Sequence, residues 1–218
     1  MGRRIGVFVD YEQTLVNLAY FYLFNPDIFI KNLVYSVANF LKYALRYRNI
    51  DLLYLIYYFL LEEDKRSDEI LNRMKKRAYL YVDENLLDLI IKLTENRSYD
   101  VKIVSSSSEK IIRGFFSELE KKYGRNINIE IIASSQYRFV TSNTKSEVAK
   151  NYDGPKICFA DGPNDVEFSR NCDLTIVKNS LFYYISPKKP IGYMPGRKKF
   201  KEVIELFKEK LTSNNFHQ

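Results

Sequence analysis

The sequence is poor in cysteine and has no long hydrophobic segment. Its two cysteines, Cys158 and Cys172, look unpaired, so we expect no disulfide scaffold and a reducing, cytoplasmic location. The longest apolar run, residues 52–61, is roughly half the length that a membrane-spanning helix needs. Residues 1–4 lead into a short apolar segment that soon meets an aspartate, so no signal peptide is expected. We therefore predict a protein with no membrane span.

Runs of basic residues that alternate with aromatic ones are also missing. The net charge is +7, but the lysines and arginines are scattered, so we expect no nucleic-acid partner. A solvated basic surface is the simpler interpretation, and attraction of a phosphate ester would be its by-product. With 46% hydrophobic and 28% charged residues, the 218-residue chain can form one main domain with a sizeable insertion, or two small domains.

Short apolar runs alternate with helical patterns over much of the chain. Buried strands are predicted at residues 4–9, 101–104, 128–133, 156–160 and 173–177. Amphipathic helices are predicted at 83–97 and at 109–123, where Gly124 follows as a C-cap. Strands that alternate with helices predict the α/β fold class, a Rossmann-like parallel sheet sandwiched by helices with right-handed crossovers.

One stretch interrupts this alternation. No good strand lies between Leu15 and Asp100, and helices are favoured at 28–47 and 52–61. Because residues 52–61 are apolar all round, we expect a buried or an interface helix there. The sequence thus predicts an α/β core domain from residues 1–15 and 82–218, with a helical domain, 16–81, inserted between them.

Two carboxylates follow the first predicted strand. Asp10 comes directly after it, and Glu12 lies two residues further on. Open α/β sheets bind their ligands at the carboxyl ends of their strands, and acids buried there need a cation or hydrogen-bond donors. The alternative is structural, with Asp10 capping a turn and Glu12 solvated.

A second acidic pair follows the strand predicted at 156–160. Asp161 and Asp165 flank Gly162 and Asn164, which allow a tight loop between them. An ordinary Gly-Pro turn would have the same residues. Two acidic strand ends in one sheet favour a metal ion, because adjacent carboxylates repel each other unless a cation neutralises them.

Hydroxyl groups and a lysine complete the candidate residues. Ser105, Ser106 and the two serines after them lie between a strand and a helix, where hydroxyl and backbone N–H groups can bind an anion. They can equally form a plain loop that caps the helix. Lys145 lies near the start of a predicted helix, and a lone lysine there is usually a surface residue.

In this order the four groups resemble the motifs of the haloacid dehalogenase superfamily of phosphatases. The family pattern is acid-x-acid-x-Thr, a strand-end Ser or Thr, a Lys, and Gly-Asp-Gly-x-Asn-Asp. This chain has Asp10-x-Glu12-x-Thr14, then Ser105, Lys145 and the segment 160–165. The resemblance implies the family's fold, with residues 16–81 as a helical cap like that of the phosphoserine-phosphatase-like branch. The segment 172–181 is also similar to methionine-salvage phosphatases.

The resemblance implies a nucleophile, a general acid and a metal site. Asp10 would attack phosphorus and carry an aspartyl-phosphate, and Glu12 would act as general acid and then as general base. Asp10, Asp161, Asp165 and Glu12, the last through its backbone carbonyl, would belong to a Mg²⁺ site.

The remaining motif residues would bind the phosphoryl group. Lys145, which is also a catalytic residue by this resemblance, would neutralise its charge together with Ser105 and Ser106, and Asn164 would donate a hydrogen bond. The partner would be a small-molecule phosphate ester.

Three departures from the family pattern concern rate and substrate. Glu12 stands where most family phosphatases have Asp, and Ala160 replaces a glycine. Ala19 stands where phosphoserine phosphatases carry a glutamate for the substrate's amino group, which argues for a less polar leaving group. The aromatic residues around Ala19 either line the pocket, pack the cap or form a homodimer contact.

Two alternatives remain beside the phosphatase. One is a phosphotransferase that uses an alcohol as acceptor. The other is a catalytically weak binding protein that keeps the fold, with Glu12 as its sign.

Overall fold

The buried apolar runs form one parallel sheet. The computed structural model describes residues 4–47, 50–77, 81–124, 126–161 and 165–178. The strands pair in the order β3-β2-β1-β4-β5, and every pairing is parallel. Their bounds are β1 Ile5–Val9, β2 Tyr99–Ser108, β3 Glu130–Ser134, β4 Lys156–Ala160 and β5 Leu174–Val177. The predicted Rossmann-like α/β sheet is therefore confirmed.

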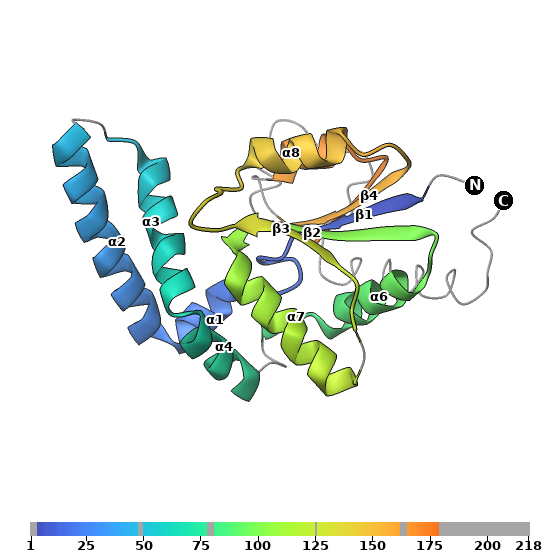
Figure 1. The fold of residues 1–218 in the computed structure, drawn as a ribbon, viewed down its shortest axis with the longest axis horizontal. Coiled ribbons are helices and arrows are strands. Elements are labelled where there is room, and N and C mark those ends of the chain that lie inside the picture. Colours follow the sequence, from blue (N-terminus) through green and yellow to red (C-terminus); the bar gives the residue numbers. More distant parts are fainter. Residues whose placement is uncertain (1–3, 48–49, 78–80, 125, 162–164, 179–218) are drawn as a thin grey trace.

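Helices cover both faces of the sheet (Figure 1). On one face lie α6 (Glu84–Glu95) and α7 (Glu109–Tyr123), and on the other lie α8 (Ser142–Lys150) and α9 (Val166–Arg170). The central strand β1 contributes side chains to the cores on both faces of the sheet, because successive side chains along a strand point to opposite faces. Val7 and Val9 pack into the larger hydrophobic core with α6 and α7, and Phe8 packs with the layer of α8 and α9.

The ends of α7 are fixed by local chemistry. The side chain of Ser108 caps its first turn by accepting a hydrogen bond from the backbone N–H of Ile111, 3.4 Å away. Gly124 ends it in the left-handed conformation, with φ of 63°. The sequence predicted both the helix and its glycine cap.

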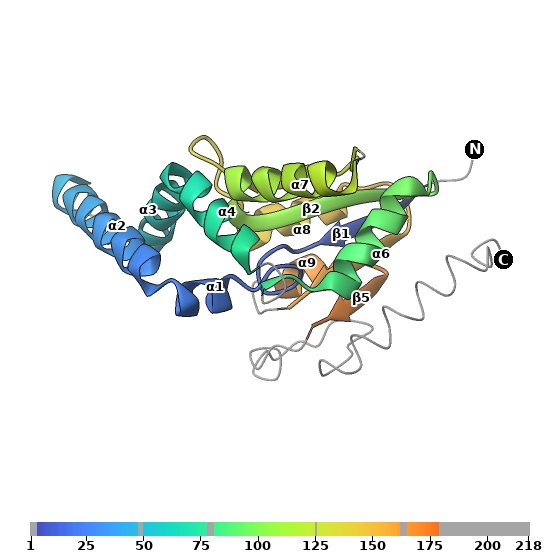
Figure 2. The same ribbon diagram turned by 90° about the horizontal axis from the view of Figure 1, so that it is seen from below.

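Among the described residues, four helices lie between β1 and α6. They are α1 Leu18–Phe24, α2 Pro26–Tyr47, α3 Leu52–Lys65 and α4 Ser67–Lys76. They lie beyond the carboxyl ends of the strands, where α2 and α3 form a hairpin that extends away from the sheet (Figures 1 and 2). The division into a core of 1–15 and 82–218 and a cap of 16–81 stays a prediction.

The chain enters and leaves this insertion side by side. Val16 pairs with Val82 in an antiparallel bridge. The N–H of Asn17 bonds to the carbonyl of Tyr81 at 2.7 Å, and the N–H of Asp83 bonds to the carbonyl of Leu15 at 2.9 Å. The two covalent links between the helices and the sheet are thus held together as a pair.

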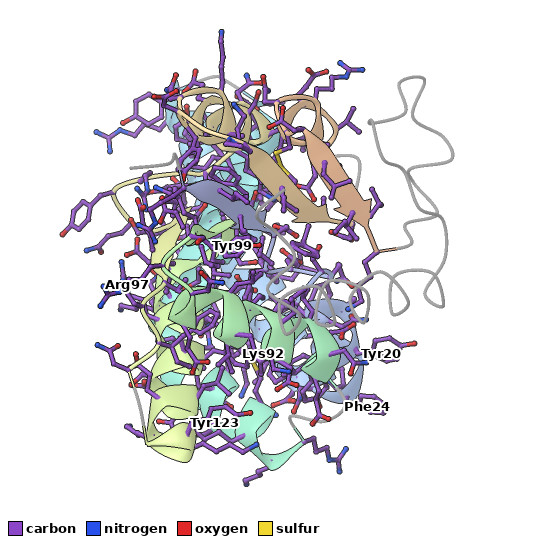
Figure 3. The ribbon with its side chains drawn as sticks, turned by 90° about the vertical axis from the view of Figure 1, so that its right-hand side faces the viewer. Tyr20, Phe24, Lys92, Arg97, Tyr99 and Tyr123 are labelled. Carbon is purple, nitrogen blue, oxygen red and sulfur yellow. A yellow bond between two sulfur atoms is a disulfide. The ribbon has the colours of Figure 1, made fainter. Side chains whose placement is uncertain are left out.

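Three details differ from the sequence prediction. Strand β2 runs on to Ser108, so the serines continue a strand and do not form a loop. The first part of the apolar run 52–61 is exposed, with Leu52 at 66%, so a fully buried helix is wrong there and the interface helix stays a prediction. Cys158 and Cys172 are joined in a disulfide (Figure 3), so the prediction that they are unpaired is wrong, and the cytoplasmic location loses that support. No described helix is long and apolar enough to span a membrane.

Candidate active site

Asp10 lies buried at the carboxyl end of the central strand. Its backbone N–H donates to the carbonyl of Phe159 at 2.9 Å, which continues the pairing of β1 with β4 for one more residue. The side chain is almost wholly buried. One carboxylate oxygen accepts from Lys145 Nζ at 2.6 Å, and the other faces the Thr14 hydroxyl at 3.4 Å. Asp10 is therefore held by side chains, and the alternative of a turn cap is not what the structure shows.

Lys145 is buried from the first turns of α8, and is not a surface lysine. Its Nζ lies 2.6 Å from an oxygen of Asp10 and 2.7 Å from one of Asp165. Burial disfavours the charged amine, but the charges of Asp10 and then Asp165 raise the pKa of Lys145 above its ordinary value. The ammonium group thus links two strand ends that are far apart in the sequence.

Asp161 completes a cluster of three carboxylates. Oxygens of Asp10, Asp161 and Asp165 lie within 4.8 Å of one another. Burial, and then the charge of Asp165, raises the pKa of Asp161 to about 7. Burial also raises the pKa of Asp10 well above its ordinary range, while Lys145 acts against it. Carboxylates this close are stabilised by a bound cation, and an all-oxygen donor set suits a hard ion such as Mg²⁺.

The loop after Asp10 turns sharply and places Glu12 beside β2. The N–H of Val16 bonds back to the carbonyl of Tyr11 at 2.8 Å, and Gln13 takes a left-handed φ of 62° within this turn. The Glu12 carboxylate accepts a hydrogen bond from the Ser107 hydroxyl at 2.9 Å. Its side chain therefore stands outside the three-carboxylate cluster, and is half-buried.

The serines differ in their surroundings. Ser105 is fully buried, and its hydroxyl accepts from the N–H of Ser107 at 3.2 Å. Ser106 is half-buried. The pairing of β2 with β3 shifts register between Ser105 and Ser108, which bends this strand end. Asn164, the remaining predicted residue, lies outside the described residues.

The helical insertion adds a buried acid that the sequence analysis missed. Glu63, on the last turn of α3, is 3% exposed and accepts a hydrogen bond from the Tyr22 hydroxyl. Burial, with a smaller contribution from the nearby charge of Glu12, raises the pKa of Glu63 to about 8 against the lowering effect of the Tyr22 hydrogen bond. The next residue, Asp64, accepts from Ser108. The available signal was three consecutive acids that end an apolar helix.

No protein-family model matches the sequence, and no curated protein matches it either. Solved structures do match. A phosphoserine phosphatase from T. onnurineus is 19% identical, with 95% of each chain covered and a TM-score of 0.53. A probable phosphoserine phosphatase from Vibrio cholerae is 12% identical, with 95% of this chain and 67% of that chain covered and a TM-score of 0.49. A substrate-bound phosphoserine phosphatase is 14% identical, with 94% of this chain and 99% of that chain covered and a TM-score of 0.48.

The similarity of the first of these structures extends over nearly all of both chains, so it concerns the sheet together with its inserted helices. Identity below a fifth is informative about the fold and not about the substrate. The resemblance inferred from the motifs is thereby confirmed at the level of the fold. The chain therefore shares the fold of the phosphoserine phosphatase from T. onnurineus.

Proposed function

We propose that the protein is a Mg²⁺-dependent phosphatase that hydrolyses a small organic phosphate monoester through an aspartyl-phosphate on Asp10. What supports the proposal most is the group of Asp10, Lys145, Asp161 and Asp165 at the carboxyl ends of β1 and β4, in which Asp161 is half-buried and the other three are buried. Placing three carboxylates together in a largely buried site costs folding energy that a purely structural role does not explain. A phosphatase-like fold with acids at these positions fits phosphoryl transfer.

In the first step a carboxylate oxygen of Asp10 attacks phosphorus. The new O–P bond forms as the bond from phosphorus to the ester oxygen breaks. Glu12 donates its proton to the leaving oxygen, so the product is a neutral alcohol. Glu12 suits this role because it is half-buried beside the cluster and is held by Ser107. Asp10 suits its role because Lys145 fixes one oxygen and leaves the second near Thr14.

In the second step water attacks the phosphorus of the aspartyl-phosphate. Glu12, now a carboxylate, takes the proton of that water, and the O–P bond to Asp10 breaks. Inorganic phosphate leaves, and the Asp10 carboxylate is restored. An alcohol in place of water would give a phosphotransferase, which is the alternative closest in chemistry.

Mg²⁺ would be held by Asp10, Asp161 and Asp165, with the backbone carbonyl of Glu12 as a further oxygen donor. When bound, it supplies positive charge that offsets the charge of the transferring phosphoryl group. Lys145 orients Asp10 and adds a second positive charge at the same place.

Further contacts to the phosphoryl oxygens would come from Ser105, Ser106 and Asn164. The leaving group is proposed to be less polar than serine, because Ala19 stands where a glutamate would hold an amino group. The cytoplasmic location and the homodimer stay predictions.

The test is hydrolysis of p-nitrophenyl phosphate with Mg²⁺. Asp10→Asn should lower the rate by roughly three orders of magnitude or more, since the nucleophile is lost. Glu12→Gln should lower it by roughly 10²–10⁴. Asp27→Asn, the same change at an exposed acid on α2, should keep full activity.

Full activity of the Asp10→Asn variant would refute the nucleophile. No turnover by the wild type across a panel of phosphorylated metabolites would favour the weak binding protein. Formation of a phosphorylated alcohol in the presence of glycerol would favour the phosphotransferase.

A further inference from the structure

Many apolar residues of the long helix α2 are exposed to solvent. This is unusual for a helix that packs only on its own chain. The face turned inward consists of Ile28, Asn32, Ser36 and Phe40, which are buried and spaced four residues apart. Two of these four are polar, and each takes part in a local hydrogen bond. Asn32 accepts from Arg66 at 2.9 Å, and the Ser36 hydroxyl donates to the carbonyl of Asn32.

The opposite face of α2 is an apolar stripe. Its members repeat at helical spacing and are exposed, namely Ile30, Val34, Val37, Leu41 and Leu45. Leu45 is 81% exposed, and Ile50 in the turn after the helix is 80% exposed. A helix that faces water is expected to expose its polar side and bury its apolar side. Here the outward face is the more apolar one, which indicates that something other than water covers it.

Exposed apolar residues are concentrated in this part of the molecule. Seventeen of the 19 large hydrophobic residues that are exposed among the described ones lie between Tyr20 and Ile56. The hairpin of α2 and α3 extends away from the sheet, so this surface is remote from the body of the core (Figure 1). Two further exposed aromatic residues, Tyr20 and Phe24, project from the neighbouring helix α1 in Figure 3. A patch of this extent marks an interaction surface.

The charges of the hairpin identify the kind of partner. Residues 28–61 of the hairpin contain four basic residues and a single acid, which gives this part a net charge of +3. The other acids of the two helices, Asp27 and residues 62–64, lie at the start of α2 and at the end of α3. Lys31 and Lys42 are exposed and lie along one border of the apolar stripe, each one residue beyond a stripe member. The acid, Asp51, is half-buried and caps α3 by accepting from the N–H of Leu53 at 2.9 Å. The outer surface therefore combines apolar and positively charged side chains.

This combination fits an anionic bilayer better than a second copy of the chain. In a two-fold dimer the same patch meets itself, so Lys31 and Lys42 would face like charges across the interface. A bilayer surface with anionic lipids accepts the apolar stripe at the level of the acyl chains and attracts the lysines to the headgroups. The hairpin also exposes three tyrosines, a residue type that is enriched at membrane–water interfaces. They are Tyr35, Tyr47 and Tyr54.

We propose that the α2–α3 hairpin binds peripherally to the surface of anionic lipid membranes, with α2 lying in the plane of the interface. The apolar stripe enters the boundary between headgroups and acyl chains, and Lys31 and Lys42 contact anionic headgroups. This binding does not depend on the phosphatase chemistry, because the stripe and the catalytic cluster share no residue.

The experiment is co-sedimentation of the full chain with vesicles of phosphatidylcholine, with and without 30 mol% phosphatidylglycerol. We expect binding to the anionic vesicles that weakens as salt is raised, and at least roughly ten-fold weaker binding without the anionic lipid. The double variant Val34→Glu/Leu45→Glu should lose binding without unfolding, because both side chains already face outward. Tyr137→Glu is the matched control, since Tyr137 is 90% exposed outside the hairpin, and it should bind like the wild type.

Charge reversal tests the electrostatic part separately. Lys31→Glu/Lys42→Glu should weaken binding to anionic vesicles by roughly ten-fold or more and remove most of its salt dependence. Absence of wild-type binding to anionic vesicles overturns the proposal. Sedimentation velocity that shows a dimer, dissociated by Val34→Glu/Leu45→Glu, together with no vesicle binding, would assign the surface to a second copy. Equal binding to both vesicle types would also overturn it, because the lysines would then play no part.

Discussion

Replacing Lys145 by methionine tests the electrostatics of the candidate site without any assumption about the substrate. The methionine keeps most of the buried volume but removes the charge that lies 2.6 Å from Asp10 and 2.7 Å from Asp165. Breaking a buried ion pair by removing one partner costs about 3–5 kcal/mol, because the other charge stays buried without a partner. For a chain of this size each kcal/mol lowers Tm by about 2–4 °C, so we expect a fall of roughly 6–20 °C.

Thermal unfolding followed by circular dichroism, without divalent cations, measures this effect. Lys150→Met is the matched control, because Lys150 lies on the same helix but is exposed, and its loss should cost within about 0.5 kcal/mol. The loss at Lys145 should grow as pH rises, since the carboxylates left behind can be neutral at low pH but are charged at high pH.

A double-mutant cycle then identifies the partner. Asp10→Asn should restore part of the stability lost in Lys145→Met, with a coupling of about 1–3 kcal/mol. Added Mg²⁺ should also restore stability, because it supplies the missing positive charge. An unchanged Tm for Lys145→Met, or no coupling with Asp10→Asn, would refute the arrangement of charges described above.

Three further outcomes are expected. Mg²⁺ at a hundred times its Kd should stabilise the wild type by about 3 kcal/mol, measured by differential scanning calorimetry. EDTA should reverse this stabilisation, and Asp161→Asn should reduce it. An unchanged Tm on addition of Mg²⁺ would argue against the metal site. The pKa of Glu63, about 8 when folded against 4.5 unfolded, means that stability is lost as pH rises through this window. Glu63→Gln should therefore become more stable relative to wild type from pH 6 to 8.5, measured by urea unfolding, and a constant difference would contradict the shift. Thr14→Val should cost about 1 kcal/mol, because a buried hydroxyl 3.4 Å from both Asp10 and Asp161 is lost, and a variant as stable as wild type would show that these contacts contribute nothing.

The sheet could be predicted from the sequence because its strands are buried on both faces. Residues 156–160 were predicted with the bounds that β4 has, since an uninterrupted apolar run leaves few other interpretations. The end of β2 was missed for the opposite reason. A run of serines is typical of a loop, and only the neighbouring strand β3 and the loop at Glu12 make the strand conformation favourable for Ser105 to Ser108.

The residues of the candidate site could be predicted from the sequence, but the contacts between them could not. Acids after two strands imply that Asp10 and Asp161 lie close together, because parallel strands end at the same edge. Lys145 could not be located in this way, since a lysine in the first turns of a helix has the same local pattern whether buried or solvated. For Glu63 the three consecutive acids at the end of an apolar helix were the available signal, but they do not show which acid is buried, because that depends on how α3 packs against β2.

Two other features depend on tertiary structure alone. The pairing of Cys158 with Cys172 requires the turn between α9 and β5 to return to β4, which the spacing of two cysteines does not reveal. The exposure of the apolar side of α2 was also not visible, because a helix rich in apolar residues does not indicate which of its sides meets the rest of the chain.

The paired entry and exit of the helical insertion at Val16 and Val82 make that insertion exchangeable. Because the two links are hydrogen-bonded neighbours, the more than sixty residues between them form a loop whose ends are held together at the edge of the core. The entropy cost of closing a loop grows only with the logarithm of its length, so a shorter or longer insertion would alter the stability of the sheet little. In evolution, the inserted helices could therefore be replaced while the residues at the carboxyl ends of the strands stay unchanged.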